Sequence, residues 1–153
     1  MAEWIGRDRK ARRCYGFDEI ALVPGAVTVN PEEVDISWKI NGKKFPIPFL
    51  ASAMDGVVDP QFAVKMGKLG GIAVLNLEGI YTRYDDYEPI LDDIAKASPD
   101  KANGLVQKLY VKPIKESLIA KRILEIKKGC TPAVVSTIPQ HAEKFGKIAE
   151  DAG

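Results

Sequence analysis

The sequence predicts an α/β fold in which short, buried, parallel strands alternate with amphipathic helices. Three short apolar runs, at residues 49–53, 72–77 and 133–138, have the length of buried strands and are bounded by turn-forming or polar residues. Between these runs, apolar residues recur at helical spacing, which favours parallel βα units with right-handed connections. The pattern does not distinguish a doubly wound open sheet from part of a (β/α)8 barrel. In both folds, ligands bind at the carboxyl ends of the strands.

The first predicted element is a hairpin over residues 34–49. Apolar and polar side chains alternate there around Asn41 and Gly42, a pair typical of tight hairpin turns. Pro46 and Pro48 argue against a central strand in the return limb, because proline cannot donate to a ladder. We expect this hairpin to cap the domain before the first buried strand.

A helix is predicted over residues 59–71, because Asp59 and Pro60 are typical of an N-cap and a first helical position, and two glycines follow the last apolar residue. Its expected inward residues are Phe62, Ala63, Met66 and Leu69.

Three further segments complete the predicted order. A helix starts at Glu88, while residues 98–112 are compatible with a short strand or a turn of helix. A longer helix is predicted from Pro113 to Gly129, and a last one over 141–152. The expected inward residues of these last two helices are Ile114, Leu118, Ile119, Ile123 and Ile126, then Ala142, Phe145, Ile148 and Ala149.

Composition indicates a globular protein of the cytoplasm. The 153 residues are 46% hydrophobic, enough for one core, and the formal charge of +1 gives no global attraction to nucleic acid or membrane. No apolar run approaches the ~18 residues of a membrane span. The charged N-terminus does not resemble a signal peptide. Cys14 and Cys130 are far apart and match no metal spacing, which suits a reducing compartment.

Three stretches resemble the IMP dehydrogenase/GMP reductase family. "YGFDEIALVPG" (15–25) is similar to the segment that leads into the family's barrel, "IPFLASAMDGVVD" (47–59) to its first strand and loop, and "LGGIAVLN" (69–76) to its second strand. The likeness is strongest to the short IMP dehydrogenase-related proteins without CBS domains. It implies the N-terminal part of a (β/α)8 TIM barrel: an arm and lead-in segment over 1–33, then the hairpin cap and the first three βα units over 34–153.

The resemblance also implies an activity. Family members transfer hydride between C2 of IMP, XMP or GMP and a nicotinamide cofactor, NAD or NADP, after a cysteine thiolate has attacked that carbon. The catalytic cysteine loop is expected beyond Gly153, so this chain alone is not expected to turn over, and the full-length protein is expected to be a homo-oligomer. The alternative is a non-catalytic α/β module that binds a nucleotide or a partner subunit.

The resemblance assigns candidate site residues at the strand ends. Ser52 and Met54 match positions that contact the nucleotide: a hydroxyl can bond ribose or phosphate, and a thioether can pack against a purine. Asp55 and Asn76 are expected to support the loops, Asp55 as a hydrogen-bond acceptor. Residues 76–78 depart from the histidine or lysine that the family commonly carries there, which weakens the expectation of the usual ligand contact from this loop.

Other chemically suggestive residues receive structural interpretations. Cys130 lies in a "GCT" that superficially resembles the family's cysteine loop, but no Gly-x-Gly-Ser precedes it, and we expect neither it nor Cys14 to be catalytic. His141, at a helix start, is expected to be a surface or capping residue. The basic run 7–13 is expected to be a solvated arm or subunit contact, and no metal site is expected.

Overall fold

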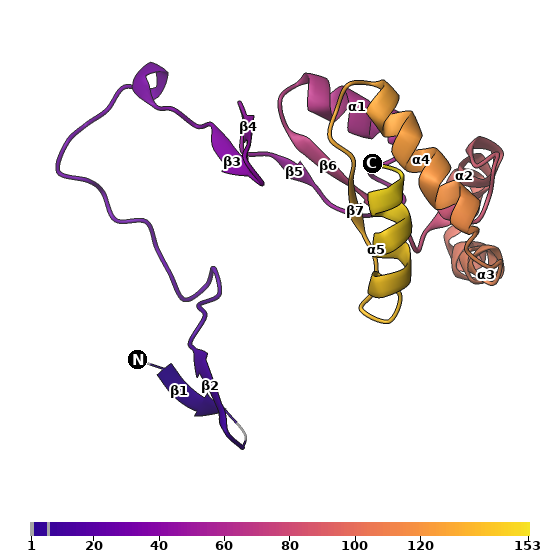
Figure 1. Ribbon diagram of the computed structural model, residues 1–153, viewed down its shortest axis with the longest axis horizontal. Coiled ribbons are helices and arrows are strands. Elements are labelled where there is room, and N and C mark those ends of the chain that lie inside the picture. Colours follow the sequence, from indigo (N-terminus) through magenta and orange to yellow (C-terminus); the bar gives the residue numbers. More distant parts are fainter. Residues whose placement is uncertain (1, 6) are drawn as a thin grey trace. The chain divides into compact units, whose positions relative to one another are not determined.

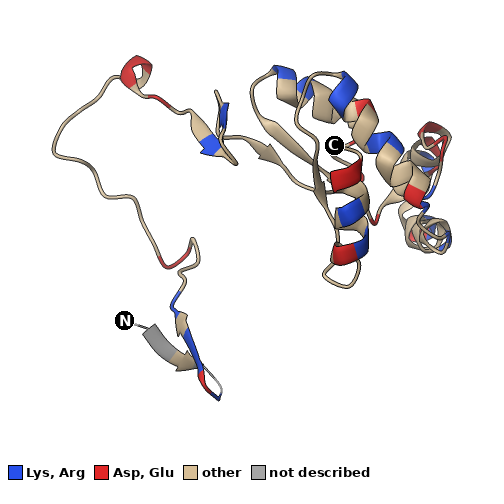
Figure 2. Cartoon of the chain, viewed as in Figure 1, with Lys and Arg blue, Asp and Glu red and all other residues tan. Residues whose placement is uncertain are grey.

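A computed structural model describes residues 2–5 and 7–153, which form two compact units, Met1–Asp35 and Ile36–Gly153. In the first unit, strand β1 (Ala2–Ile5) pairs with β2 (Arg9–Arg12) in an antiparallel ladder that sets Trp4 opposite Lys10. A short 3-10 helix, η1 (Pro31–Glu33), follows (Figure 1). Basic side chains line β2 (Figure 2), so part of the expected solvated arm is a hairpin strand.

The second unit opens with another hairpin, β3 (Trp38–Ile40) and β4 (Lys43–Phe45). Asn41 and Gly42 form its turn with φ angles of 48° and 76°, the left-handed conformation that a two-residue type I′ turn requires. The pairing is shorter than the predicted 34–49, because Phe45 is followed by a proline. The Trp38 indole N–H donates to the carbonyl of Ile47 at 2.8 Å and fastens the hairpin to the chain that follows.

A parallel sheet with the order β5-β6-β7 forms the centre of this unit. Its strands are β5 (Leu50–Ala51), β6 (Ile72–Asn76) and β7 (Val134–Ser136). β5 is shorter than the predicted 49–53, because the chain turns at once and the Met54 N–H bonds the carbonyl of Ser52 at 2.8 Å. The three carboxyl ends therefore lie at one edge of the sheet.

Helices connect the strands of the sheet and follow the last one (Figure 1): α1 (Pro60–Lys68), α2 (Glu88–Lys96), α3 (Pro99–Tyr110), α4 (Glu116–Lys128) and α5 (Ala142–Asp151), with a 3-10 turn, η2 (Ile80–Thr82). The ambiguous segment 98–112 is mostly the helix α3. The predicted start of α4 at Pro113 is wrong by three residues, since the Lys115 N–H is engaged by the carbonyl of Thr82 at 2.8 Å and Lys115 is the N-cap.

The buried stripe of α1 differs from the predicted one. Ala63 is buried, but Phe62 and Leu69 are 37% and 71% exposed. A Cβ on Gly67 would lie 1.5 Å from Thr131 Oγ1, so the helix approaches its neighbours along the 63–67 line and the 62–69 line faces outward. On α5, Phe145 is buried as predicted, whereas Ala142 is exposed.

Helix α4 joins the two hydrophobic clusters of the core. Its predicted stripe is confirmed: Ile126 belongs to one cluster, with Leu75 and Tyr81, and Ile119 and Ile123 belong to the other, with Leu77 and Phe145. The stripe also carries a buried cation, which the periodicity did not predict.

That cation, Arg122, fastens the chain after η2 onto α4. Its guanidinium donates to the carbonyls of Tyr81, Tyr84 and Asp85 at 2.6 to 3.0 Å and to the carboxylate of Glu125 at 2.9 and 3.0 Å. A buried guanidinium is tolerated because its donors are satisfied.

Candidate functional site

Polar side chains from all three strand ends meet at the carboxyl edge of the sheet. Two hydrogen bonds join the loops: Asn76 Nδ2 donates to Asp55 Oδ1 at 3.1 Å, and Thr137 Oγ1 donates to Glu78 Oε1 at 2.5 Å. The first bond links the loops after β5 and β6, and the second links those after β6 and β7. The edge is thus a single connected polar surface at the place where α/β folds bind ligands.

Asp55 is the centre of the first group of contacts. Beyond Asn76, its carboxylate accepts from the Ile80 backbone N–H and the Tyr110 hydroxyl, both at 2.5 Å, while the Tyr81 hydroxyl donates to its backbone carbonyl at 2.6 Å. These partners come from β6, η2 and α3. An acceptor with so many donors fixes the turn after β5 relative to the rest of the edge.

Gly79 makes room for this carboxylate. A Cβ at position 79 would lie 1.9 Å from Asp55 Oδ1, far inside contact distance. Its φ of −93° is open to any residue, so glycine is needed here for space and not for backbone conformation. Asn76 Oδ1, in turn, accepts the Glu78 N–H at 3.0 Å and shapes the same loop.

Glu78 is the centre of the second group. Its carboxylate accepts from Thr137 Oγ1 and from the Ile138 N–H at 3.4 Å, and it lies 3.0 and 3.2 Å from His141 Nδ1. Burial alone would raise the pKa of the Glu78 carboxyl, but the donors from Thr137, His141 and Ile138 outweigh it and hold that pKa below its ordinary value. Glu78 is therefore ionised at neutral pH.

Ser52 and Met54 lie on the turn that Asp55 fixes, and both side chains are exposed. The Met54 carbonyl accepts the N–H groups of Val57 and Val58 at 2.9 Å, so its backbone is held while its thioether, 57% exposed, stays open to solvent. The structure thus brings the two candidate nucleotide contacts together on one turn, with Asp55 and Asn76 behind them.

Three residues of the candidate site were not predicted from the sequence. Tyr81 and Tyr110 bond Asp55 from 26 and 55 residues away, and burial raises the pKa of both phenols, so they remain protonated donors. His141 was expected to be a surface or capping residue, but it contacts Glu78 across 63 residues. The helix start at position 141 gave no signal of that contact.

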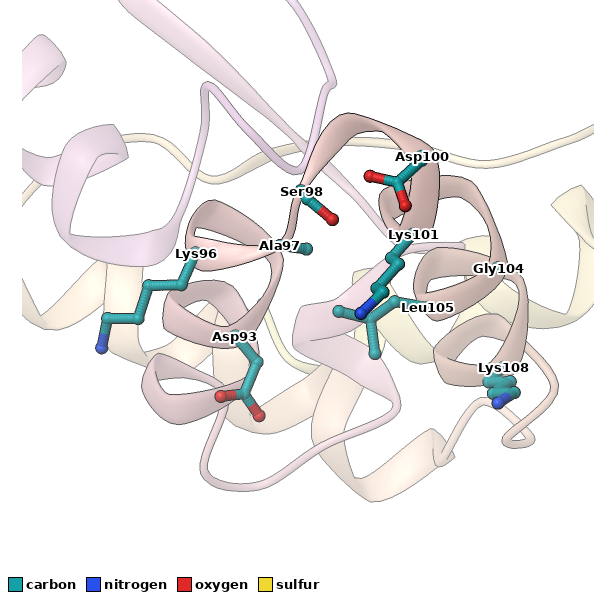
Figure 3. A pocket seen from close by; sticks show the side chains of 9 residues that line it. All are labelled: Asp93, Lys96, Ala97, Ser98, Asp100, Lys101, Gly104, Leu105 and Lys108. Carbon is teal, nitrogen blue, oxygen red and sulfur yellow. The ribbon is translucent and has the colours of Figure 1, made fainter.

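One pocket adjoins the turn after β5, and another lies between two helices. One, of about 350 Å³, lies beside Asp55 and is lined also by Asp59, Tyr81 and residues of α2. A larger one, of about 790 Å³, lies between α2 and α3 (Figure 3). Its lining is local to that helix pair, mixes Lys and Asp side chains, and contains none of the candidate site residues, so we assign it no function.

Among the described residues, the cysteines and the possible metal ligands do not form a second candidate site. Cys130 follows α4 at the amino end of β7 with φ of 59°, and both cysteines are exposed and unbridged. Within residues 2–5 and 7–153, no group of three or more His, Cys, Asp or Glu side chains is arranged to hold a metal ion. Over the same residues, no helix is both long and apolar enough to cross a membrane.

Comparison with known proteins finds one matching family model and several similar sequences. Residues 14–85 match the model of the IMP dehydrogenase / GMP reductase domain. An uncharacterised oxidoreductase of Mycobacterium tuberculosis H37Rv is 32% identical over 97% of this chain and 41% of its own length. The inosine-5'-monophosphate dehydrogenase of Methanocaldococcus jannaschii is 30% identical over 62% of this chain and 21% of its own length.

One solved structure is similar over nearly the whole chain. The IMP dehydrogenase/GMP reductase-like protein from Corynebacterium glutamicum matches with a TM-score of 0.81 and 29% identity, covering 99% of this chain and 42% of that protein. The chain therefore spans less than half the length of the relatives that it matches.

Proposed function

We propose that the chain, which matches the IMP dehydrogenase / GMP reductase domain over residues 14–85, belongs to that family and forms part of the nucleotide site of a purine nucleotide oxidoreductase. In this proposal the two units supply the lead-in segment, the cap and the first three βα units of a (β/α)8 barrel. The reaction class is hydride transfer between C2 of a purine nucleotide and a nicotinamide cofactor. The complete protein would act in the cytoplasm as a homo-oligomer.

The observation that carries the proposal is the turn after β5. Asp55 is tied to three other segments, while the Ser52 hydroxyl and the Met54 thioether stay exposed on the same turn. A hydroxyl can bond the ribose or phosphate, and a polarizable thioether can cover one face of a purine. Ser52 and Met54 therefore act in binding, and Asp55 and Asn76 act by holding them in place.

The residues of this chain fit only a part of a nicotinamide cofactor. The sequence contains no glycine-rich loop to cradle a diphosphate. The side chains at the ends of β6 and β7 are hydroxyls, a carboxylate and an imidazole, which suit sugar hydroxyls better than phosphates. When bound, the cofactor would accept or supply the hydride, and we assign no residue of this chain to that step.

Nucleotide binding tests the proposal directly. IMP and GMP would be titrated into the purified chain by calorimetry, and at least one should bind. Met54→Glu places a carboxylate against the purine and phosphate of the ligand, so it should weaken binding at least tenfold while circular dichroism shows the fold retained. Ser52→Ala should weaken binding by about twofold to tenfold, the loss of one hydrogen bond.

Leu69→Glu is the matched control. Leu69 is also an exposed apolar residue, but it lies at the end of α1 that leads into the amino end of β6, the opposite edge of the sheet. It should leave binding unchanged. If neither nucleotide binds the folded chain, the proposed nucleotide site is wrong, and a module that binds a partner subunit becomes the better interpretation.

A further inference from the structure

His141 is held at one ring nitrogen and open at the other. Nδ1 lies 3.0 Å from Glu78 Oε1, and the ring packs against Phe145 with the centroids 4.9 Å apart. In the part of the chain that the structure describes, Nε2 has no hydrogen-bond partner, and the side chain is 44% exposed. In the neutral ring, a carboxylate beside Nδ1 favours the tautomer with the proton on Nδ1, which leaves a lone pair on Nε2.

The carboxylate that orients this ring is itself fixed. Thr137 Oγ1 and the Ile138 N–H donate to Glu78 Oε1, and the guanidinium of Arg83 donates to the Glu78 backbone carbonyl through Nη2 at 2.9 Å. Side chain and backbone of Glu78 are thus both held from neighbouring segments. A carboxylate that holds an imidazole in one orientation is typical of binding and catalytic sites, where the position of the ring matters.

We propose that His141 Nε2 accepts a hydrogen bond from a ribose hydroxyl of a nucleotide bound at the carboxyl edge of the sheet. The inference rests on the proposed function and extends the site from β5 to β7. Two strand spacings separate those strands, roughly 10 Å, a distance within the span of a nucleotide ligand. Met54 is assigned to one face of the purine, and the adjoining ribose offers uncharged hydroxyl donors.

A phosphate fits this position poorly. The Nε2 lone pair can only accept a hydrogen bond, and a phosphate at neutral pH offers acceptors. The ionised Glu78 carboxylate next to the ring would also repel a phosphate. A ribose hydroxyl donates and is uncharged, so it matches both features. Such a ribose can belong to a purine mononucleotide or to a nicotinamide dinucleotide.

The chain contains a single histidine, so imidazole NMR signals report on His141 alone. The ¹⁵N-labelled chain would be titrated with IMP, GMP, NAD and NADP while the Nε2 resonance is followed. We expect one of these ligands to move that resonance, and its identity distinguishes the mononucleotide from the dinucleotide source. The 2′- or 3′-deoxy analogue of that ligand should no longer move it and should bind about threefold to tenfold more weakly.

Variants give the second measurement. His141→Ala should weaken binding of the ribose ligand by the same threefold to tenfold, yet leave binding of the deoxy analogue unchanged. Glu143→Gln, an exposed change in the first turn of α5, should leave both unchanged. If a ligand saturates the chain by calorimetry and the His141 resonance does not move, this inference is overturned and the nucleotide site stands. If no ligand binds, both proposals fail together.

Discussion

The contact between Asp55 and Gly79 allows a quantitative test of the carboxyl edge. Asp55→Ala removes a carboxylate that accepts three hydrogen bonds, from Asn76, Ile80 and Tyr110. Each net bond to a charged group contributes about 1.5 to 3 kcal/mol when isolated. Since Asn76 and Tyr110 are only half-buried and can recover water, we expect a total loss of about 3 to 5 kcal/mol in the free energy of unfolding.

Gly79→Ala tests the same contact from the other side. Its Cβ would lie 1.9 Å from Asp55 Oδ1, and the three atoms nearest to it all belong to the Asp55 carboxylate. Overpacking of this kind costs about 1 to 3 kcal/mol. In the Asp55→Ala background the obstructing atoms are gone, so Gly79→Ala should then cost less than about 0.5 kcal/mol, the usual range for a substitution that meets no obstacle.

The assay is urea unfolding followed by circular dichroism on the wild type, both single variants and the double variant. Asp86→Ala, an exposed carboxylate nearby in sequence, is the control and should change stability by no more than about 0.5 kcal/mol. An equal cost of Gly79→Ala in both backgrounds would refute the reasoning, because the penalty would then arise from the backbone or from another neighbour.

Three further outcomes follow from the structure. Gly104→Ala, in the open interior of α3, should stabilise the chain by about 0.5 to 1 kcal/mol. Gly67→Ala should destabilise it, because the added Cβ would clash with Thr131, and thermal unfolding of both variants tests the contrast. Cys130→Gly should stabilise by about 0.5 to 1 kcal/mol, because φ of 59° strains an exposed residue that has a Cβ, and a lower unfolding temperature would contradict this. The lowered pKa of Glu78 adds stability that is present above its ordinary value of 4.5 and is lost as the pH falls through the folded value. Acid titration of Glu78→Gln should therefore show a shallower loss below pH 4.5, and an unchanged profile would remove Glu78 from the acid response.

The order of strands and helices could be predicted because each element carries its own local signal. α4 was read from its apolar stripe and α1 from its N-cap. α3 could not be assigned, since Gly104 and many polar residues weaken its periodicity, and Leu109 and Tyr110 at its end pack against the core. The prediction that Phe62 and Leu69 point inward is wrong, because the close approach at Gly67 decides which side of α1 is buried.

The candidate site was predictable only in part, for a related reason. Strand ends locate Ser52, Met54 and Asp55 in the chain, and the nucleotide-binding roles of Ser52 and Met54 remain predictions. The donors that reach Asp55 and the ring that reaches Glu78 come from distant positions with no shared pattern. Tertiary contacts of this kind leave no periodic trace in a single sequence.

The long span of the Asp55 network has a kinetic consequence. Its bond to Tyr110 closes a loop of 55 residues, and its bonds to Ile80 and Asn76 close loops of 25 and 21. Closing such loops costs chain entropy before any contact compensates for it, so the bond to Tyr110, which closes the longest of the three, should form after the helices and the β5-β6 pair. Asp55→Ala should then accelerate unfolding and leave the folding rate nearly unchanged. The carboxyl edge would be the last part of this unit to become ordered as the chain folds and the first to open.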